Sequence, residues 1–149
     1  MPSARGEADV AVDAEAAWTF VRDYDAWADL FPGYQRHLVT SPRVSRWTVR
    51  GDVGMFSRVI EAEVEVVQDT PGVRFAVRGV EENFRGEGMF DVVPLGVDRS
   101  RLALALDLRA GGPMAPVINA LLTARLPGLL DTFAPALARR IEQKVASGR

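Results

Sequence analysis

The stretch that decides the fold is 114-MAPVINALLTARLPGLLDTFAPALARRIEQKV-145, near the carboxyl end of the chain. Its apolar residues recur at intervals of three and four, the spacing of one helical face: Ile118, Leu121, Leu122, Leu126, Leu129, Leu130, Phe133, Leu137 and Ile141. A helix of about thirty residues spans ~45 Å, so its apolar face needs a large surface to cover it. Pro127-Gly128 predicts a kink or break near residues 124–126, because proline removes an amide donor. The kink would either hold the helix against a curved sheet or act as a hinge.

The chain before this helix alternates apolar and polar residues, which is typical of antiparallel strands with one covered face. Strands are expected from Ala8 onward and then over 34–41, 44–53, 56–67, 73–79, 84–92 and 102–108. After the first strand, Asp13 predicts a helix N-cap, and a second short helix is expected over 25–31. A turn is expected at Asp69-Thr70-Pro71-Gly72. Residues 1–6 and 147–149 are expected to be frayed ends. The pattern predicts a single α+β domain over 1–149, with about seven strands curved around the long helix.

Composition excludes several classes of protein. With 18 Lys and Arg against 20 Asp and Glu, the net charge of −2 argues against nucleic acid as a partner. No apolar run approaches the ~18 residues of a membrane span. The amino-terminal MPSARGEADV has no apolar signal core, so a cytoplasmic location is expected. There is no cysteine, which excludes disulfides and thiolate chemistry.

Metal and cofactor chemistry is not expected. The chain has one histidine, His37, and no cysteine, so histidine and cysteine supply too few donors for the usual zinc or iron site. RGEGMF at 85–90 falls in a strand pattern and is therefore no dinucleotide fingerprint. His37 itself is expected to be exposed on an edge strand.

Charged residues alternate on two neighbouring strands of the prediction. Glu61, Glu63 and Glu65 could lie opposite Arg46 and Arg50, where cross-strand ion pairs would help to fix the register. These acids are expected to form a solvated face of the sheet.

The apolar faces of the strands and the long helix would converge on one interior. Glycines at Gly51, Gly79, Gly86 and Gly88 fall on the inward registers, where they remove side-chain volume and let a sheet bend. We therefore expect a cavity rather than a filled core, and Gly86→Leu or Ala62→Phe should block it without unfolding the protein. Polar Asn119, Arg125 and Arg140 on or beside the helical stripe are expected near its rim or on the surface. The predicted ligand-binding residues are Trp47, Val49, Ile60, Ala62, Val64, Phe75, Val77, Phe84, Gly86, Phe90, Leu104, Leu106, Ile118, Asn119, Leu122, Arg125, Leu129 and Phe133.

The segment VDAEAAWTFVRDYDAWADLFPGY at 12–34, with W-x-x-L-F-P at 27–32, resembles the opening of the SRPBCC (START and Bet v 1-like) superfamily. FPGY at 31–34, W-x-V at 47–49, RGEGMF and Gly-Gly-Pro-Met-Ala-Pro at 111–116 look closest to the carbon-monoxide dehydrogenase G family. Polyketide cyclases and aromatases share the W-x-x-L-F-P element. The resemblance implies a helix-grip fold with a hydrophobic pocket between sheet and long helix. It implies lipophilic quinones and membrane contact for the first family, and polyketide dehydration for the second.

Two functions remain open at this point. The first is a carrier for a hydrophobic small molecule, such as an isoprenoid quinone or other lipid, serving a redox enzyme as monomer or homodimer, with transient membrane contact. The second is a cyclase or dehydratase, which needs positioned acid and base groups. Tyr34, His37, Asn83, Arg125 and Asp107 are the candidates, but alternation turns Asp107 away from the leucine face. An interior with few titratable groups favours the carrier.

Overall fold

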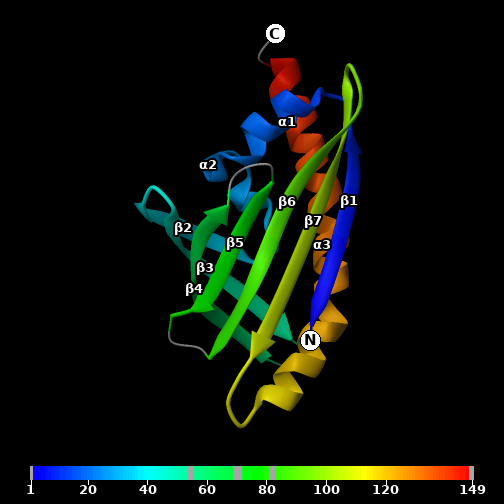
Figure 1. Cartoon of the computed structure of the whole chain (residues 1–149). Helices are drawn as coiled ribbons and strands as arrows, with labels where there is room; N and C mark the ends of the chain where they lie inside the picture. Colours follow the sequence, from blue (N-terminus) through cyan, green and yellow to red (C-terminus); the bar gives the residue numbers. More distant parts are fainter. Residues whose placement is uncertain (1, 54–55, 69–71, 81–82, 148–149) are drawn as a thin grey trace.

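A seven-stranded antiparallel sheet curves around one side of a long helix in the computed structural model, which describes residues 2–53, 56–68, 72–80 and 83–147 (Figure 1). The strand order is β1-β7-β6-β5-β4-β3-β2. The predicted helix-grip fold, with seven strands and one long carboxyl-terminal helix, is confirmed. The strands are β1 (Ser3–Val10), β2 (Tyr34–Ser41), β3 (Val44–Val53), β4 (Phe56–Gln68), β5 (Val73–Gly79), β6 (Phe84–Gly96) and β7 (Arg99–Ala110). The turn predicted at 69–72 lies mostly outside the described residues.

Three short helical segments connect β1 to β2. Asp13 caps α1 (Ala14–Val21) as predicted, because its carboxylate accepts a hydrogen bond from the Ala16 amide at 3.4 Å. The single second helix expected over 25–31 is instead α2 (Tyr24–Trp27) followed by a 3-10 turn, η1 (Ala28–Leu30). The chain therefore changes direction at Trp27, whose indole Nε1 donates to the Val21 carbonyl oxygen at 3.0 Å.

Residues 3–6 form part of a strand rather than a frayed end, contrary to the sequence-based expectation, and Met1 lies outside the described residues. Ser3–Val10 forms β1 and pairs with β7 along its whole length, from Ser3 opposite Asp107 to Val10 opposite Ser100. A Cβ at Gly6 would lie 3.2 Å from Cβ of Leu130, so glycine allows the long helix to approach the strand closely. The prediction failed because this strand carries small residues where the helix covers it.

The carboxyl-terminal helix, α3 (Ala115–Ser147), continues past Pro127 and Pro135. The predicted break is therefore wrong, and the alternative of a kink near Pro127 stays a prediction. The frayed end expected at 147–149 lies outside the described residues except for Ser147, which is helical. The helix packs mainly on β1 and β7, and it lies behind these strands in Figure 1. Its buried residues begin only at the middle of the helix and are Leu126, Leu130, Phe133, Ala134, Leu137, Ala138 and Ile141. Earlier in the helix, Ile118 and Leu121 remain 39% and 37% exposed.

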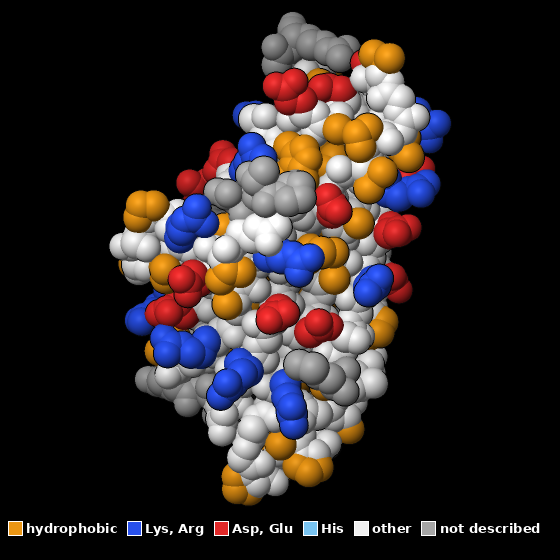
Figure 2. All heavy atoms as spheres, viewed as in Figure 1, with side chains coloured by type: hydrophobic (Ala, Val, Ile, Leu, Met, Phe, Trp, Pro, Cys, Tyr) orange, Lys and Arg blue, Asp and Glu red, His pale blue; other side chains and the backbone are white. Residues whose placement is uncertain are grey.

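The outer face of the sheet carries charged side chains of both signs (Figure 2). Arg46 lies opposite Glu63, as predicted, whereas Arg50 lies opposite Val59. Glu63 also forms an ion pair with Arg78 at 3.0 Å across the next strand. Within the described part of the chain, no group of three acidic or histidine side chains is placed to hold a metal ion. This face is thus a solvated surface that helps to fix the register.

The helices also bear on the question of membrane spanning. Among the described residues, no helix is both long and apolar enough to cross a membrane, α3 included.

Candidate functional site

The strand registers bring the predicted strand residues onto one inner face. Trp47 lies opposite Ala62, and Val64 lies opposite Val77. Farther along the sheet, Phe90 lies between Val73 and Leu104, and Gly88 lies between Phe75 and Leu106. Because Trp47, Phe75, Phe90 and Leu104 are buried, this face is the one turned towards the core. The alternation of the sequence therefore assigned the inner face correctly, while ligand contact at these residues stays a prediction.

One end of the inner face is filled by aromatic side chains. The Trp27 ring lies 5.9 Å from Trp47, 5.1 Å from Phe90 and 5.7 Å from Phe133, measured between ring centroids. Phe31 packs edge-on against Phe133 at 5.6 Å. Trp47, Phe90 and Phe133 belong to the packed core beside Trp27, and ligand contact at these three residues stays a prediction.

The rest of the inner face is only partly covered. Because α3 packs mainly on β1 and β7, the apolar residues of the middle strands are left half-buried. They are Val49, Ile60, Ala62, Val64, Val77, Phe84 and Leu106, and Leu122 and Leu129 on α3 have the same intermediate burial. We call the strand residues of this set the inner wall.

The glycine substitution proposed from sequence would not spare the fold. Gly86 faces inward, but a Cβ at this position would collide with the Asp107 carbonyl oxygen and come within 2.8 Å of Leu108. Gly86 is therefore required by close strand contact, and Gly86→Leu would disrupt the sheet itself. At Gly51, by contrast, a Cβ would lie 4.0 Å from the Ile60 side chain, an ordinary contact distance.

Two of the polar residues on α3 have structural partners. Asn119 accepts from the Ala110 amide at 2.8 Å and donates to the Ala110 carbonyl at 3.2 Å, which ties the start of α3 to the end of β7. It also lines an open surface hollow of about 470 Å³ with Arg109 and Thr123. Arg125, which was also predicted near the rim or on the surface, is exposed.

Arg140 pairs with a carboxylate rather than facing a ligand. Its guanidinium donates to both carboxylate oxygens of Asp29, at 3.1 and 2.9 Å, and to the Ala26 carbonyl at 3.1 Å. This hydrogen bond lowers the pKa of Asp29 below its ordinary value of 3.8 and raises the pKa of Arg140. The pair joins α3 to the α2–η1 segment, so the role of Arg140 is structural.

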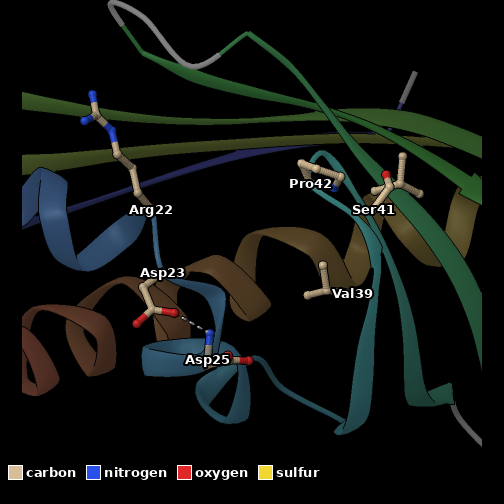
Figure 3. Close-up of a pocket in the computed structure, with 7 residues that line it drawn as sticks. Arg22, Asp23, Asp25, Val39, Ser41 and Pro42 are labelled. Atoms are coloured by element: carbon tan, nitrogen blue, oxygen red, sulfur yellow. Dashed lines mark hydrogen bonds between the residues drawn. The ribbon is translucent and has the colours of Figure 1, made fainter.

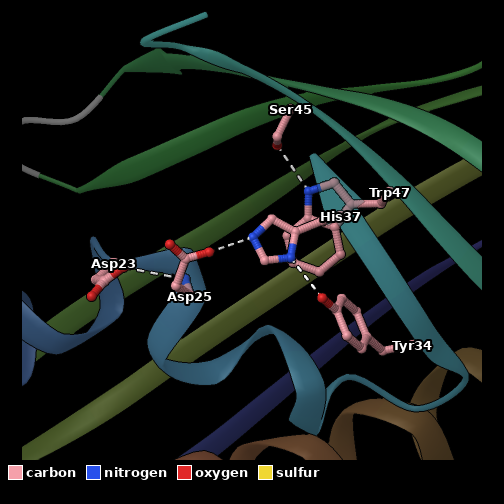
Figure 4. Close-up of polar contacts among 6 residues, drawn as sticks. All are labelled: Asp23, Asp25, Tyr34, His37, Ser45 and Trp47. Atoms are coloured by element: carbon pink, nitrogen blue, oxygen red, sulfur yellow. Dashed lines mark hydrogen bonds and ion pairs between the residues drawn. The ribbon is translucent and has the colours of Figure 1, made fainter. Parts of the chain in front are cut away.

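His37 is the main site residue that the sequence analysis misplaced. Its ring is only 10% exposed, although β2 is an edge strand as expected. Nδ1 of His37 lies 2.7 Å from the Tyr34 hydroxyl oxygen, and Nε2 lies 2.7 Å from Oδ1 of Asp25 (Figure 4). Two titratable side chains, Tyr34 and His37, therefore face inward on β2, with Asp25 behind them. The sequence analysis expected few titratable groups in the interior, but these two side chains lie on its inner face.

Trp47 packs against the rings of both His37 and Tyr34 and restricts their positions. The His37 ring stacks on the Trp47 ring at 5.2 Å with an interplanar angle of 28°, and the Tyr34 ring meets Trp47 edge-on at 5.8 Å. The Trp47 indole Nε1 donates to Oγ of Ser45 at 2.8 Å, and Ser45 is 1% exposed. The carboxylate end is anchored too, because Asp23 accepts a hydrogen bond from the Asp25 amide at 3.2 Å.

The Asp25 carboxylate, at one end of the hydrogen-bonded series Tyr34–His37–Asp25, is open to solvent. Asp25 is 78% exposed, and it lines a hollow of about 200 Å³ between the α1–α2 connection and the β2–β3 hairpin (Figure 3). The other lining residues are Arg22, Asp23, Val39, Ser41, Pro42 and Val44. Tyr34, His37 and Asp25 thus connect the inner face to a solvent-open hollow.

Comparison with known proteins agrees with this architecture. Residues 1–142 match the sequence model of a family described as polyketide cyclase / dehydrase and lipid transport. A search of curated protein sequences gave no match, and the comparisons do not confirm the narrower resemblance to the carbon-monoxide dehydrogenase G family.

Solved structures share the fold at low sequence identity. A conserved protein from Geobacillus kaustophilus has a TM-score of 0.75 at 15% identity, covering 98% of this chain and 96% of that one. The ZhuI aromatase/cyclase from Streptomyces sp. R1128 has a TM-score of 0.74 at 16% identity, covering 98% and 97%. A START superfamily protein from Mycobacterium smegmatis has a TM-score of 0.61 at 21% identity, covering 99% of each chain. With the family match over nearly the whole sequence, these likenesses in fold lead to one conclusion: the chain belongs to the polyketide cyclase/dehydrase and lipid transport family of the SRPBCC superfamily, a family of proteins that bind hydrophobic small molecules.

Proposed function

We propose that this protein binds an elongated or fused-ring apolar molecule between the inner wall and the first half of α3. The observation that supports this most is the half-buried apolar surface of β3–β6, from Val49 and Ile60 to Val77 and Phe84. A folded domain usually covers such a surface, because exposed apolar area is unfavourable in water. Ile118 on α3 is also left partly exposed. A ligand lying there would complete the core that α3 leaves open.

The energy available from such contact is sufficient for useful affinity. Removing ~200 Å² of ligand apolar surface from water contributes about 5 kcal/mol before the cost of association, at ~25 cal/mol per Å². No charged contact is then required, which fits an inner wall made of aliphatic and aromatic side chains. An isoprenoid quinone or another lipid has the right chemistry, and in this function the protein carries it to a redox enzyme. The partner enzyme, any membrane contact and the choice between monomer and homodimer stay predictions.

A second candidate function is a cyclase or dehydratase acting on a polyketide-like ligand held in the same place. A specific observation favours it: Tyr34 and His37 lie within hydrogen-bond distance on the inner face. The family description joins polyketide chemistry with lipid transport, so membership is compatible with either function.

Ligand binding can be tested by thermal shift and native mass spectrometry. The panel contains ubiquinone and menaquinone analogues with short side chains, fatty acids, sterols and aromatic polyketides. We expect at least one class to raise the melting temperature and to give a one-to-one complex. A panel without any binder would overturn the proposal. A ligand recovered unchanged after long incubation supports the carrier, and a dehydrated or cyclised product supports the enzyme.

A further inference from the structure

We propose that Tyr34, His37 and Asp25 form an acid–base site that removes a proton from a ligand carbon next to a carbonyl group. This inference rests on the proposed function, since it requires a ligand on the inner wall. Tyr34 is the catalytic residue in this arrangement. His37 and Asp25 act through Tyr34 and are positioning residues.

The hydrogen-bond partners set the direction of proton transfer. An ionised Asp25 can only accept hydrogen bonds, so the Nε2 of a neutral His37 carries the proton that faces it at 2.7 Å. Nδ1 then holds a lone pair, and the Tyr34 hydroxyl donates to it at 2.7 Å. The phenolic oxygen of Tyr34 is left with lone pairs that can accept a proton from a ligand. Both contacts are within the reach that general acid–base catalysis needs.

The position of Tyr34 links the acid–base site to the inner wall. Tyr34 lies opposite Val49 on β3, and Val49 lies opposite Ile60 on β4, so the three form one cross-strand row. All three are half-buried. At the far end, the Asp25 carboxylate reaches the solvent-open hollow (Figure 3). Protons can therefore enter or leave at the surface while the ligand stays on the inner side.

A purely structural role explains this arrangement less well. The contact between His37 and a carboxylate as exposed as that of Asp25, at 78%, contributes little to stability, because water competes for the carboxylate. The same residues are nevertheless held closely, with His37 stacked on Trp47 and Trp47 fixed by Ser45 (Figure 4). Such fixing of reacting groups is what lowers the entropic part of a reaction barrier.

The proposed step balances without an oxidant or a cofactor. The ligand C–H bond breaks, its proton passes to the Tyr34 oxygen, and the Tyr34 hydroxyl proton passes to Nδ1 of His37. The electron pair of the broken bond moves to the carbonyl oxygen and leaves an enolate. His37 becomes an imidazolium that faces the Asp25 carboxylate. Trp47 and Ser45 on β3 are uncharged. Return of the proton to the oxygen gives the enol, and return to the carbon restores the ligand.

Deuterium exchange tests this step directly. The probe is 2-tetralone, a fused-ring ketone with exchangeable hydrogens next to its carbonyl group, dissolved in D₂O and followed by proton NMR. We expect the wild-type protein to exchange these hydrogens faster than buffer does. Tyr34→Phe and His37→Gln should lower the rate at saturating probe by about 100-fold or more, the usual range for loss of an acid–base group. Asp25→Asn should give a smaller loss, and Asp98→Asn, in the exposed β6–β7 turn, should give none.

Binding and exchange must be measured separately. The half-saturating concentration of 2-tetralone should stay nearly constant in Tyr34→Phe while the maximal rate falls, a split that general destabilisation would not produce. If 2-tetralone binds but exchanges no faster than in buffer, or if Tyr34→Phe exchanges as fast as the wild type, the acid–base site is wrong and the binding function stands. If neither 2-tetralone nor any member of the ligand panel binds, both proposals are wrong.

Nitrogen NMR supplies a readout that needs no ligand. Because His37 is the one histidine of the sequence, its ring nitrogens give unambiguous signals in uniformly ¹⁵N-labelled protein. We expect the neutral ring to carry its proton on Nε2, and Tyr34→Phe to shift the Nδ1 signal more than the Nε2 signal. A wild-type ring protonated on Nδ1 would contradict the hydrogen-bond directions and overturn the inference.

Discussion

The hydroxyl oxygen of Tyr34 lies 2.7 Å from Nδ1 of His37, although the two residues are three positions apart on one strand. In a regular strand, side chains three positions apart point to opposite faces. A register shift between Tyr34 and Arg36 changes this, because Tyr34 pairs with Val49 and His37 pairs with Trp47, two residues earlier on β3. The extra residue of the bulge turns both side chains to the inner face.

Gly33→Ala should disturb this bulge from its amino-terminal side. Gly33 has φ of +84°, and a Cβ there would collide with the carbonyl oxygen of Arg50. The Arg50 amide also donates to the Gly33 carbonyl at 2.8 Å, so the turn begins the β2–β3 pairing. We expect the free energy of unfolding to fall by more than ~1 kcal/mol, since the left-handed region alone costs this much. Urea denaturation measures it.

A glycine in open space is the control for this substitution. A Cβ at Gly96 would have no heavy atom of the described residues within 4 Å, so Gly96→Ala should change stability little. Equal losses for the two variants would show that the Gly33 turn does not need glycine.

Ala62→Phe should block ligand binding. Ala62 is half-buried on the inner face, between Trp47 on β3 and Gly79 on β5, so a phenyl ring would occupy the space next to the inner wall. We expect the dissociation constant of a ligand found in the screen to rise at least tenfold, which corresponds to about 1.4 kcal/mol. Isothermal titration calorimetry measures it.

Ala76→Phe is the matched control for Ala62→Phe, because it makes the same change on the neighbouring strand. Ala76 is half-buried on the outer face, opposite Glu65 and Glu87. The affinity of the Ala76→Phe variant for the same ligand should equal that of the wild type. If both variants bind equally well, the ligand lies elsewhere.

Leu137→Ala should be strongly destabilising. Leu137 is 0% exposed within the core that α3 forms, and removing three carbons leaves a cavity. We expect a loss of about 2–5 kcal/mol in the free energy of unfolding, the range for buried leucines. Leu121→Ala makes the same change on the same helix at a residue that is 37% exposed, and its loss should be well below that of Leu137→Ala. Similar losses would mean that the first half of α3 is packed as tightly as the second.

The Asp29–Arg140 pair should make stability depend on acid pH. The Arg140 hydrogen bond lowers the folded-state pKa of Asp29 below 3.8, so the folded protein binds a proton there less readily than the unfolded chain. Its stabilisation is therefore complete above pH 3.8 and is lost as pH falls through the folded-state value. Because the Asp29 side chain is 56% exposed, we expect at most about 1 kcal/mol.

Asp29→Asn isolates this contribution. The difference between the free energies of unfolding at pH 7 and at pH 3 should be smaller in the variant than in the wild type. An unchanged difference would mean that the pair contributes nothing to stability.

The strand and helix pattern could be predicted from the sequence because it depends on local periodicity. Alternation placed β2 and β3 at their observed bounds and assigned Trp47, Ala62 and Phe90 to the inner face. The stripe in α3 predicted the helix that covers the sheet, and Asp13 predicted the start of α1. These features follow from which residues share a face of one element, and side-chain spacing along the chain determines that.

Contacts between elements were decided by the tertiary structure. β1 was missed at Ala4 and Gly6 because α3 demands small residues there, a requirement that only the packed partner reveals. Arg140 was expected near a ligand rim or on the surface, but its partner is Asp29, 111 positions away in the sequence.

The acid–base site depends on the same kind of information. Period-two alternation puts Tyr34 and His37 on opposite faces, and only the bulge formed against β3 brings them together. Asp25 joins them because the chain turns at Trp27 and brings α2 over the edge of β2. The sequence by itself thus determined the elements and the inner face of the sheet. The tertiary structure decided which polar groups meet, because that depends on where separate elements come into contact.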